Sequence, residues 1–533
     1  MKPVPLAHRP YRRNFTVSLT HLVLLALFAP VAWAQTKLYD VDAPTPIDNG
    51  LFGVDAIAIG DRNSDGVQDF SVSDQTGVHI FSGVDGEHLF TITGPPDSLF
   101  FGVGSQQSFG TPVGLIRNQT SDVIAVGADG ANSFVGRAFT FSGSGQLAFT
   151  FDSPGLGGFG SSVVDAGDPD GDGFHRIGIG AFAGEGVVYF YDSFSGALTD
   201  SVKSPDPHVG SLFGLVLRNM GDLNDDGVDE LAVAAPTDSI PGFDRAGRVF
   251  LFNGATLQFI YALTSPNAEA DGVFGAAMDN IGDVDDDGAA DIAVSTFGED
   301  AGGTDAGRVY VFSGVDGTLL FDLFSPNPQA VGRFGRTLAG VGDVDGDGLP
   351  DIAVGAADEN NTTGRVYVFS GDDQLITTIE PDESAGDSIL FGIDLAALGD
   401  VNDDGRADLF IGAPGFDRGA IVNAGTGSVW SYMDGGVANE TDTELPESAI
   451  VESVFPNPFR GSTTIRYTLS EATAVRLAVY DALGREVRVL REGTAPPGRH
   501  DEQFDASGFA AGVYVLILDS ASGRSTTSLT LLE

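Results

Sequence analysis

Five acidic loops of one design recur along the chain, and their side chains could hold metal ions. Each loop has oxygen-bearing side chains at positions 1, 3, 5 and 9 and a glycine at position 6. A hard cation takes about six to eight oxygen ligands, and glycine permits the sharp turn that brings alternate side chains inward. The expected side-chain ligands are Asp61, Asn63, Asp65 and Asp69; Asp222, Asn224, Asp226 and Glu230; Asp283, Asp285, Asp287 and Asp291; Asp343, Asp345, Asp347 and Asp351; and Asp400, Asn402, Asp404 and Asp408.

Position 7 has no common side chain, as expected where only the backbone carbonyl would bind the ion. Carboxylates this close would repel one another without a cation, and flexible all-protein sites hold Mg²⁺ less readily than Ca²⁺. Asp-Gly sequences also make hairpin turns without metal, but the fivefold register favours metal binding. We therefore expect about five Ca²⁺ ions. The residues at position 7 are Val67, Val228, Ala289, Leu349 and Arg406.

Two further segments depart from this design. In one, Asp168, Asp170 and Asp172 keep positions 1, 3 and 5, but Arg176 stands at position 9, so a sixth ion is left open. In the other, residues 117–122 have lost the pattern, and we expect no calcium there.

Phe-Gly pairs recur at intervals of 50 to 61 residues, and a period of this size is typical of a propeller or solenoid. Each clear unit contains four short strands bounded by Gly or Asp, which is one propeller blade. The sequence therefore predicts an all-β, seven-bladed β-propeller over residues 35–434. The pairs are Phe52-Gly53, Phe109-Gly110, Phe159-Gly160, Phe213-Gly214, Phe274-Gly275, Phe334-Gly335 and Phe391-Gly392.

The seventh unit ends after its third strand, at residues 427–432. Residues 36–44 match the pattern of the fourth strand at 318–326 at equal length. We therefore expect the N-terminal strand to complete blade seven, which closes the ring without an open edge between the first and last blades.

The Phe-Gly pairs, the acidic loops and Gly412-Ala413-Pro414 resemble the FG-GAP repeats of the integrin α-subunit head, across residues 36–433. The resemblance implies a seven-bladed propeller whose calcium loops join the first two strands of several blades on one face. It also implies that the Phe side chains of the Phe-Gly pairs lie in the core between blades. The chain has no Arg-Gly-Asp tripeptide and no inserted von Willebrand-like domain. The partners of integrins are therefore not carried over to this chain.

Composition restricts the function. A net charge of -48 with few lysines argues against nucleic-acid binding, and the absence of cysteine excludes disulfides and thiolate sites. Residues 1–34 have the layout of a signal peptide cleaved before Gln35; a membrane anchor and twin-arginine export, through Arg12-Arg13, are alternatives. No later segment has the roughly 18 apolar residues that a membrane span needs.

A second module follows an acidic, proline-containing linker at residues 435–449. Alternating strands in residues 450–533 predict a small Ig-like β-sandwich. Its Pro456-Asn457-Pro458-Phe459, Val479-Tyr480 and Gly512-Val513-Tyr514 resemble the type A C-terminal sorting domain of the type IX (Por) secretion system. That resemblance implies contact with the secretion machinery and a location outside, or on the outer membrane of, a Gram-negative bacterium. A FlgD-like structural sandwich is the alternative.

These features favour a non-enzymatic adhesion or interaction protein with a protein or glycan ligand. The sequence has no G-x-S-x-G, H-E-x-x-H or phosphate-binding motif. A hydrolase that uses the propeller channel and a lectin-like sugar binder are the alternatives. The histidines outside the signal segment share no blade position, and Trp430, Tyr432 and Phe243 are the candidate sugar-binding aromatics. These histidines are His79, His88, His175, His208 and His500.

Overall fold

The computed structural model describes most of the chain from Ala34 onward. The predicted signal peptide, the linker and the Phe109-Gly110 pair lie outside the described residues, except that Ala34 begins a strand. The described residues are 34–95, 113–119, 121–131, 135–155, 157–381, 388–417, 421–433, 450–455, 459–469, 473–481, 485–495, 498–506, 508–509, 512–520 and 523–531.

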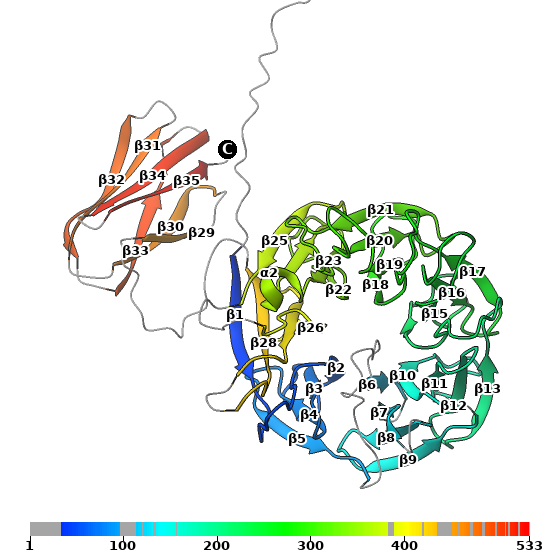
Figure 1. Ribbon diagram of the computed structural model, residues 1–533. Helices are drawn as coiled ribbons and strands as arrows, with labels where there is room; N and C mark the ends of the chain where they lie inside the picture. The colour runs from blue at the N-terminus through cyan, green and yellow to red at the C-terminus, as the bar shows by residue number, and fades with distance from the viewer. Residues whose placement is uncertain are drawn as a thin grey trace, which may run out of the picture. The chain divides into compact units, whose positions relative to one another are not determined.

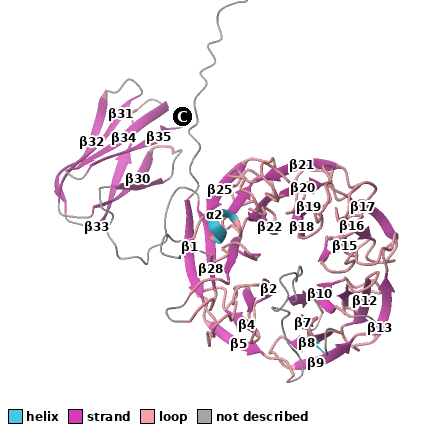
Figure 2. Ribbon diagram, viewed as in Figure 1, coloured by secondary structure: helices cyan, strands magenta, loops and turns pink. Residues whose placement is uncertain are grey.

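Seven four-stranded antiparallel sheets, the blades, form a ring (Figure 1). The predicted seven-bladed propeller is therefore confirmed. Almost all regular structure in the described residues is strand, and helix is confined to very short segments such as α2 (Glu359–Thr362) (Figure 2). The first six blades are β2 (Ala56–Gly60), β3 (Asp69–Ser73), β4 (Val78–Phe81) and β5 (His88–Ile92); β6 (Val113–Ile116), β7 (Val123–Ala128), β8 (Arg137–Ser142) and β9 (Leu147–Asp152); β10 (Phe159–Asp165), β11 (Arg176–Ala181), β12 (Val187–Asp192) and β13 (Leu198–Val202); β14 (Leu217–Asn219), β15 (Leu231–Ala235), β16 (Arg248–Phe252) and β17 (Phe259–Leu263); β18 (Met278–Gly282), β19 (Asp291–Thr296), β20 (Arg308–Phe312) and β21 (Leu319–Phe324); and β22 (Thr337–Gly342), β23 (Asp351–Gly355), β24 (Val366–Phe369) and β25 (Leu375–Ile379).

Blade seven is built from both ends of the propeller sequence. Its strand order is β26 (Leu395–Gly399), β27 (Asp408–Ala413), β28 (Thr426–Met433) and β1 (Ala34–Val41). Strand β1 pairs antiparallel with β28, with Thr36 opposite Ser431 and Val41 opposite Gly427. The inner strand of this blade, β26, contacts β2 of blade one. The predicted closure by the N-terminal strand is confirmed.

Burial decreases from the second strand of a blade to the outermost one. Strand β15 is buried at every residue, whereas β13 is exposed at four of its five residues. A second strand is covered on both faces by neighbouring blades, so it is a continuous apolar run without alternation. The inner strands surround a cavity of about 530 Å³.

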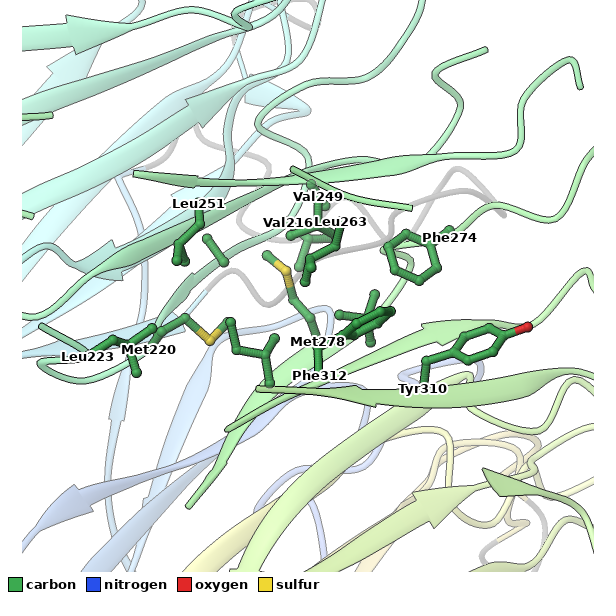
Figure 3. Packing of buried hydrophobic residues seen from close by; sticks show 14 of the residues in the cluster. Val216, Met220, Leu223, Val249, Leu251, Leu263, Phe274, Met278, Tyr310 and Phe312 are labelled. Carbon is green, nitrogen blue, oxygen red and sulfur yellow. The ribbon is translucent and has the colours of Figure 1, made fainter. Parts of the chain in front are cut away.

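Neighbouring blades share their cores. One core contains Val249, Leu251 and Leu263 from blade four together with Phe274 and Phe312 from blade five (Figure 3). The six described Phe residues of the Phe-Gly pairs are all buried, with at most 3% of their surface exposed. Their predicted place in the core is confirmed.

A glycine before the third strand lets each Phe backbone approach the preceding blade. Gly307 has φ 87°, and a Cβ there would lie 2.1 Å from the Phe334 carbonyl oxygen. Gly247 and Gly364 show the same approach to Phe274 and Phe391. A side chain at these positions would push adjacent blades apart.

Residues 450–531 contain two further sheets. One has the order β29-β30-β33 and the other β32-β31-β34-β35. Their facing side chains, including Leu477, Phe504 and Leu516, form a separate apolar core. The predicted β-sandwich is confirmed. Its strands are β29 (Ile450–Phe455), β30 (Ser462–Leu469), β31 (Thr473–Asp481), β32 (Glu486–Ala495), β33 (Gly498–Asp505), β34 (Gly512–Ser520) and β35 (Gly523–Leu531).

Candidate metal centres

The acidic loops join the first and second strands of six blades. They connect β2 to β3, β10 to β11, β14 to β15, β18 to β19, β22 to β23 and β26 to β27. In an antiparallel blade, the connections between strands one and two and between strands three and four lie at the same end. The six loops therefore lie on one face of the ring.

The position-1 aspartate organises each loop by accepting backbone N–H groups. The N–H of the position-6 glycine donates to it in all six loops, at 2.7 to 3.0 Å. These glycines have φ between 88° and 97°, where a side chain would be strained. The sequence-based role of Gly at position 6 therefore has a conformational basis. The bonds join Gly66 to Asp61, Gly173 to Asp168, Gly227 to Asp222, Gly288 to Asp283, Gly348 to Asp343 and Gly405 to Asp400.

A second left-handed residue, at position 4, was missed by the sequence reasoning. Its φ lies between 60° and 80° in all six loops. Gly, Asn and Asp tolerate this conformation best, and the short polar residues at position 4 were the available signal. The residues are Ser64, Gly171, Asp225, Asp286, Gly346 and Asp403.

The position-5 aspartate links each loop to its own turn, because one carboxylate oxygen accepts the N–H of position 7. In four blades the other oxygen accepts a bond from a residue just after the third strand or near its end: Asn253, Ser313, Ser370 or Ser431. These partners were also missed. The position-7 donors are Val67, Phe174, Val228, Ala289, Leu349 and Arg406.

The position-9 acid is the buried member of the five loops that have one. Asp69, Glu230, Asp291, Asp351 and Asp408 are at most 1% exposed. Each accepts the position-2 N–H at 2.6 to 2.9 Å, from Arg62, Leu223, Val284, Val344 or Val401. This bond closes the loop onto the start of the second strand.

Three of the loops bring three carboxylates together in the described part of the chain. Ligand oxygens within 4.8 Å of one another come from Asp283, Asp285 and Asp291 in one blade and from Asp343, Asp345 and Asp347 in the next. The third such group is Asp168, Asp170 and Asp172. The roles of the individual residues as ligands stay a prediction.

The buried carboxylates fit a bound cation. Burial, reinforced by other acids of the same loop, raises the pKa of Asp351 to about 8, that of Asp408 to about 7 and that of Asp291 to about 6. Asp351 Oδ1 is buried and has no hydrogen-bond partner among the described residues. An ionised carboxylate in this position is costly unless a positive charge pairs with it. The donor set, all oxygen, matches a hard cation such as Ca²⁺.

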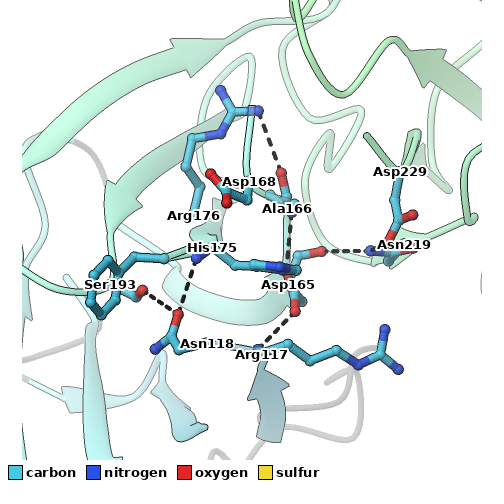
Figure 4. Close-up of polar contacts among 12 residues, drawn as sticks. Arg117, Asn118, Asp165, Ala166, Asp168, His175, Arg176, Ser193, Asn219 and Asp229 are labelled. Carbon is cyan, nitrogen blue, oxygen red and sulfur yellow. Dashed lines mark hydrogen bonds and ion pairs between the residues drawn. The ribbon is translucent and has the colours of Figure 1, made fainter. Parts of the chain in front are cut away.

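In the loop of blade three, the residues at positions 2 and 9 both differ in type from those of the other loops; Figure 4 shows Arg176, at position 9. Position 2 is Pro169, which has no N–H, so the loop needs no position-9 acid to accept it. Arg176 occupies position 9 and donates instead to the carbonyl oxygens of Ala166 and Gly254. Arg176 therefore does not replace the position-9 carboxylate, and the three aspartates lie together without a fourth one.

In blade two, the segment that corresponds to the acidic loop of the other blades forms hydrogen bonds with blade three. Asn118 Oδ1 accepts the His175 N–H at 3.0 Å and the Ser193 hydroxyl at 2.9 Å, both from blade three (Figure 4). Asp122 accepts the Asn118 N–H at 3.0 Å, as a position-9 acid does elsewhere. The expectation of no calcium in blade two stays a prediction.

The proposed sugar-binding aromatics do not form one surface. Tyr432 is 3% exposed and Trp430 packs against the core beside Phe391, whereas Phe243 is 41% exposed. Only Phe243 of the three presents much surface to a ligand.

No helix in the described ranges is both long and apolar enough to cross a membrane.

Comparison with known proteins identifies both parts of the chain. The FG-GAP repeat family matches residues 334–369 and 391–432, and the family described as "Secretion system C-terminal sorting domain" matches residues 453–531. The sorting domain indicates export to the cell surface or the extracellular space.

Curated relatives of the propeller are integrin α-subunits. The chain is 31% identical to integrin alpha-4 of Xenopus laevis over 187 residues, which is 32% of this chain and 17% of the relative. It is 28% identical to human integrin alpha-X over 254 residues, 44% of this chain and 21% of the relative. It is also 28% identical to bovine integrin alpha-2 over 314 residues, 54% of this chain and 26% of the relative. The chain thus spans about a quarter or less of these relatives' length, and it is an integrin-α-like FG-GAP repeat protein with a secretion system C-terminal sorting domain.

Proposed function

We propose that this protein is a calcium-binding interaction protein of the adhesion type, exported by its sorting domain, and that it is not an enzyme. The observation that carries the proposal is the repeated loop geometry: six loops share the position-1 bond to the position-6 glycine. Calcium would neutralise the clustered carboxylates and fix the first two strands of each blade. A rigid ring with variable connections is a suitable platform for a partner.

The polar contacts of His175 and His208 support a structural reading. His175 Nδ1 lies 2.7 Å from Asp165 Oδ1, beside the hydrogen bonds that join blades two and three. His208 Nδ1 lies 3.0 Å from Asp238 Oδ1. Each of these histidines is held by a contact that links neighbouring segments. None of them requires a catalytic role to explain its position.

A protein partner is the ligand class that we favour over a glycan. Large apolar side chains are exposed in connections between strands or blades, including Val209 at 81% and Val422 at 51%. Single exposed apolar side chains are common on protein surfaces and are compatible with a protein partner, whereas the sugar-binding alternative depends on an accessible aromatic platform. Of the three aromatic candidates, only Phe243 is substantially exposed.

The proposal is tested in two steps with the purified protein. Bound calcium is first counted by equilibrium dialysis, for which we expect five or six ions per chain. Binding to arrays of glycans and of extracellular matrix proteins is then compared in calcium and in EDTA. We expect calcium-dependent protein binding. Binding to glycans alone would show that the ligand is a glycan and not a protein. A calcium count near zero would overturn the proposal that the acidic loops bind calcium.

A further inference from the structure

Two histidines that are separate in sequence meet on blade one, away from the calcium loops. His79 lies on β4 and is 2% exposed, and His88 lies on β5 and is exposed. Their ring centroids are 6.0 Å apart. Across the strand pair, His79 stands opposite Thr91, which lies three residues after His88.

Both imidazoles point a nitrogen at the same hydroxyl group. His79 Nδ1 lies 2.9 Å from Thr91 Oγ1, and His88 Nε2 lies 2.9 Å from the same oxygen. Gly77 leaves space for the Thr91 methyl group, because a Cβ at Gly77 would lie 2.9 Å from it. The Thr91 side chain is thereby held with its hydroxyl between the two rings.

The outer partners of the rings fix which nitrogen carries hydrogen. His79 Nε2 lies 3.0 Å from Asp74 Oδ1, which only accepts, so Nε2 carries a hydrogen and Nδ1 is the nitrogen that can offer a lone pair to a metal ion. His88 also hydrogen-bonds the Phe90 backbone in a way that raises its pKa, which means that the ring donates there. Its Nε2 is then the lone-pair nitrogen. With both rings neutral, two lone pairs face one hydroxyl, which has a single hydrogen to give.

Asp74 supplies the support that metal-binding histidines usually have. Metal-bound imidazoles typically donate their other N–H to a carboxylate, which fixes the ring orientation. Asp74 is 1% exposed and accepts the Thr76 hydroxyl at 2.6 Å. Its Oδ2 is buried and has no hydrogen-bond partner among the described residues. Phe52 and Phe81 pack against the two imidazoles, with centroids 5.8 and 5.6 Å away.

We propose that His79 and His88 bind one borderline divalent transition-metal ion, such as Zn²⁺, with Thr91 and water completing its coordination. Imidazole nitrogen suits Zn²⁺, Cu²⁺ and Ni²⁺, whereas Ca²⁺ takes oxygen ligands, so this site and the calcium loops select different ions. The exposed His88 is the side through which the ion enters.

The histidine pair is separate from the calcium loop, because neither histidine belongs to that loop and the supporting Asp74 lies at the other end of the blade. Asp74 is in the connection between β3 and β4, whereas the acidic loop joins β2 to β3. A change at the histidine pair should therefore leave calcium binding intact. This separation lets the two metal assignments fail independently.

The test is a titration of the full chain with ZnCl2 by isothermal calorimetry, at neutral pH and in excess CaCl2. We expect one Zn²⁺ per chain for the wild type, loss of that site in His88→Asn, and binding about 10- to 100-fold weaker in Asp74→Asn. His88 is exposed, so its substitution should not disturb folding, and circular dichroism checks this.

His208→Asn is the matched control, because His208 also pairs with a buried carboxylate but is 49% exposed at its side chain and lies in a different blade. It should bind Zn²⁺ as the wild type does. Zinc binding that is unchanged in His88→Asn, or a wild type that binds no zinc, overturns the proposal. With Cu²⁺ as the probe, electron paramagnetic resonance should show coupling to two imidazole nitrogens. A spectrum without imidazole coupling would also contradict the proposal.

Discussion

At the scale of single residues, the position-9 acid shows most clearly why the loops need a cation. Asp351 is fully buried, accepts the Val344 N–H at 2.7 Å with Oδ2 and leaves Oδ1 without a described partner. Its pKa is raised by burial first and by the charges of Asp345 and Asp347 next. The same carboxylate is therefore unfavourable when ionised alone and favourable when it binds Ca²⁺.

Asp351→Asn should have opposite effects with and without calcium. In saturating calcium the variant loses one ion, which costs about 2.7 kcal/mol of stability when calcium is at a hundred times its Kd. In EDTA it should be as stable as the wild type or more so, because the substitution removes a buried negative charge. Denaturant unfolding in both conditions measures this. Asp372→Asn, an exposed acid of the same blade, is the control and should change neither value; a loss of stability in EDTA for Asp351→Asn would contradict the account.

Sequence predicts the ligand residues of the loops better than their supports. Oxygen side chains at fixed spacing are visible in one dimension, but the bonds from Ser313, Ser370 and Ser431 to position 5 depend on which strands meet. The pairing of His79 with His88 was missed for the same reason, since it needs the register of β4 on β5. Pro169 and Arg176 can be read in the sequence as departures from the loop pattern. Their connection cannot, because it depends on the hydrogen bond that the position-2 N–H donates to the position-9 carboxylate in the other loops.

At the scale of elements, buried polar latches join the fourth strand of one blade to the next blade. Ser265 follows β17, and its hydroxyl donates to Glu299, which also accepts the Tyr310 hydroxyl at 2.7 Å. Ser325, Glu359 and Tyr367 repeat the arrangement one blade later. A buried carboxylate whose hydrogen bonds are all made favours one specific arrangement of the two blades.

Tyr310→Phe should destabilise the propeller by about 1–3 kcal/mol, because it removes a donor from the buried carboxylate of Glu299. Tyr189→Phe is the matched control: Tyr189 stands at the equivalent strand position of blade three, and no glutamate partner is described for it. Chemical denaturation compares the two variants. Equal effects would show that the latch contributes no specific stability.

The closure by β1 permits a second test at this scale, because the chain has no cysteine. Asp40 and Ser428 stand opposite each other on β1 and β28, at a spacing compatible with a disulfide. Asp40→Cys combined with Ser428→Cys should raise the stability of the oxidised protein by about 2–4 kcal/mol over its reduced form. Thermal unfolding of both forms measures the difference. If oxidation leaves the transition unchanged, β1 does not close the ring in solution.

The ring closure was predictable because its signal is a repeated pattern with one missing member. Residues 36–44 match an outer strand, and only blade seven lacks one. The observed strand, Ala34–Val41, begins earlier and ends before Pro44, since strand pairing with β28 sets its limits. Strand ends depend on such partners, which a pattern does not specify.

At the scale of the whole molecule, the loops make stability depend on pH and calcium together. In EDTA, stability should fall as pH rises from about 4 through the raised pKa values of about 6 for Asp291, 7 for Asp408 and 8 for Asp351, because the folded state binds more protons in this window. In calcium the trend should reverse, since protons compete with the ion for the same carboxylates. Melting temperatures across this range measure both slopes; equal slopes in EDTA and calcium would refute the linkage.

The central claim is that the acidic loops hold calcium and that the propeller depends on it. Its most direct test is the thermal unfolding of the purified protein at neutral pH, recorded in calcium and again after exchange into EDTA. The account predicts a markedly lower unfolding temperature in EDTA, restored when calcium is added back. An unfolding temperature that is the same in both conditions would contradict it.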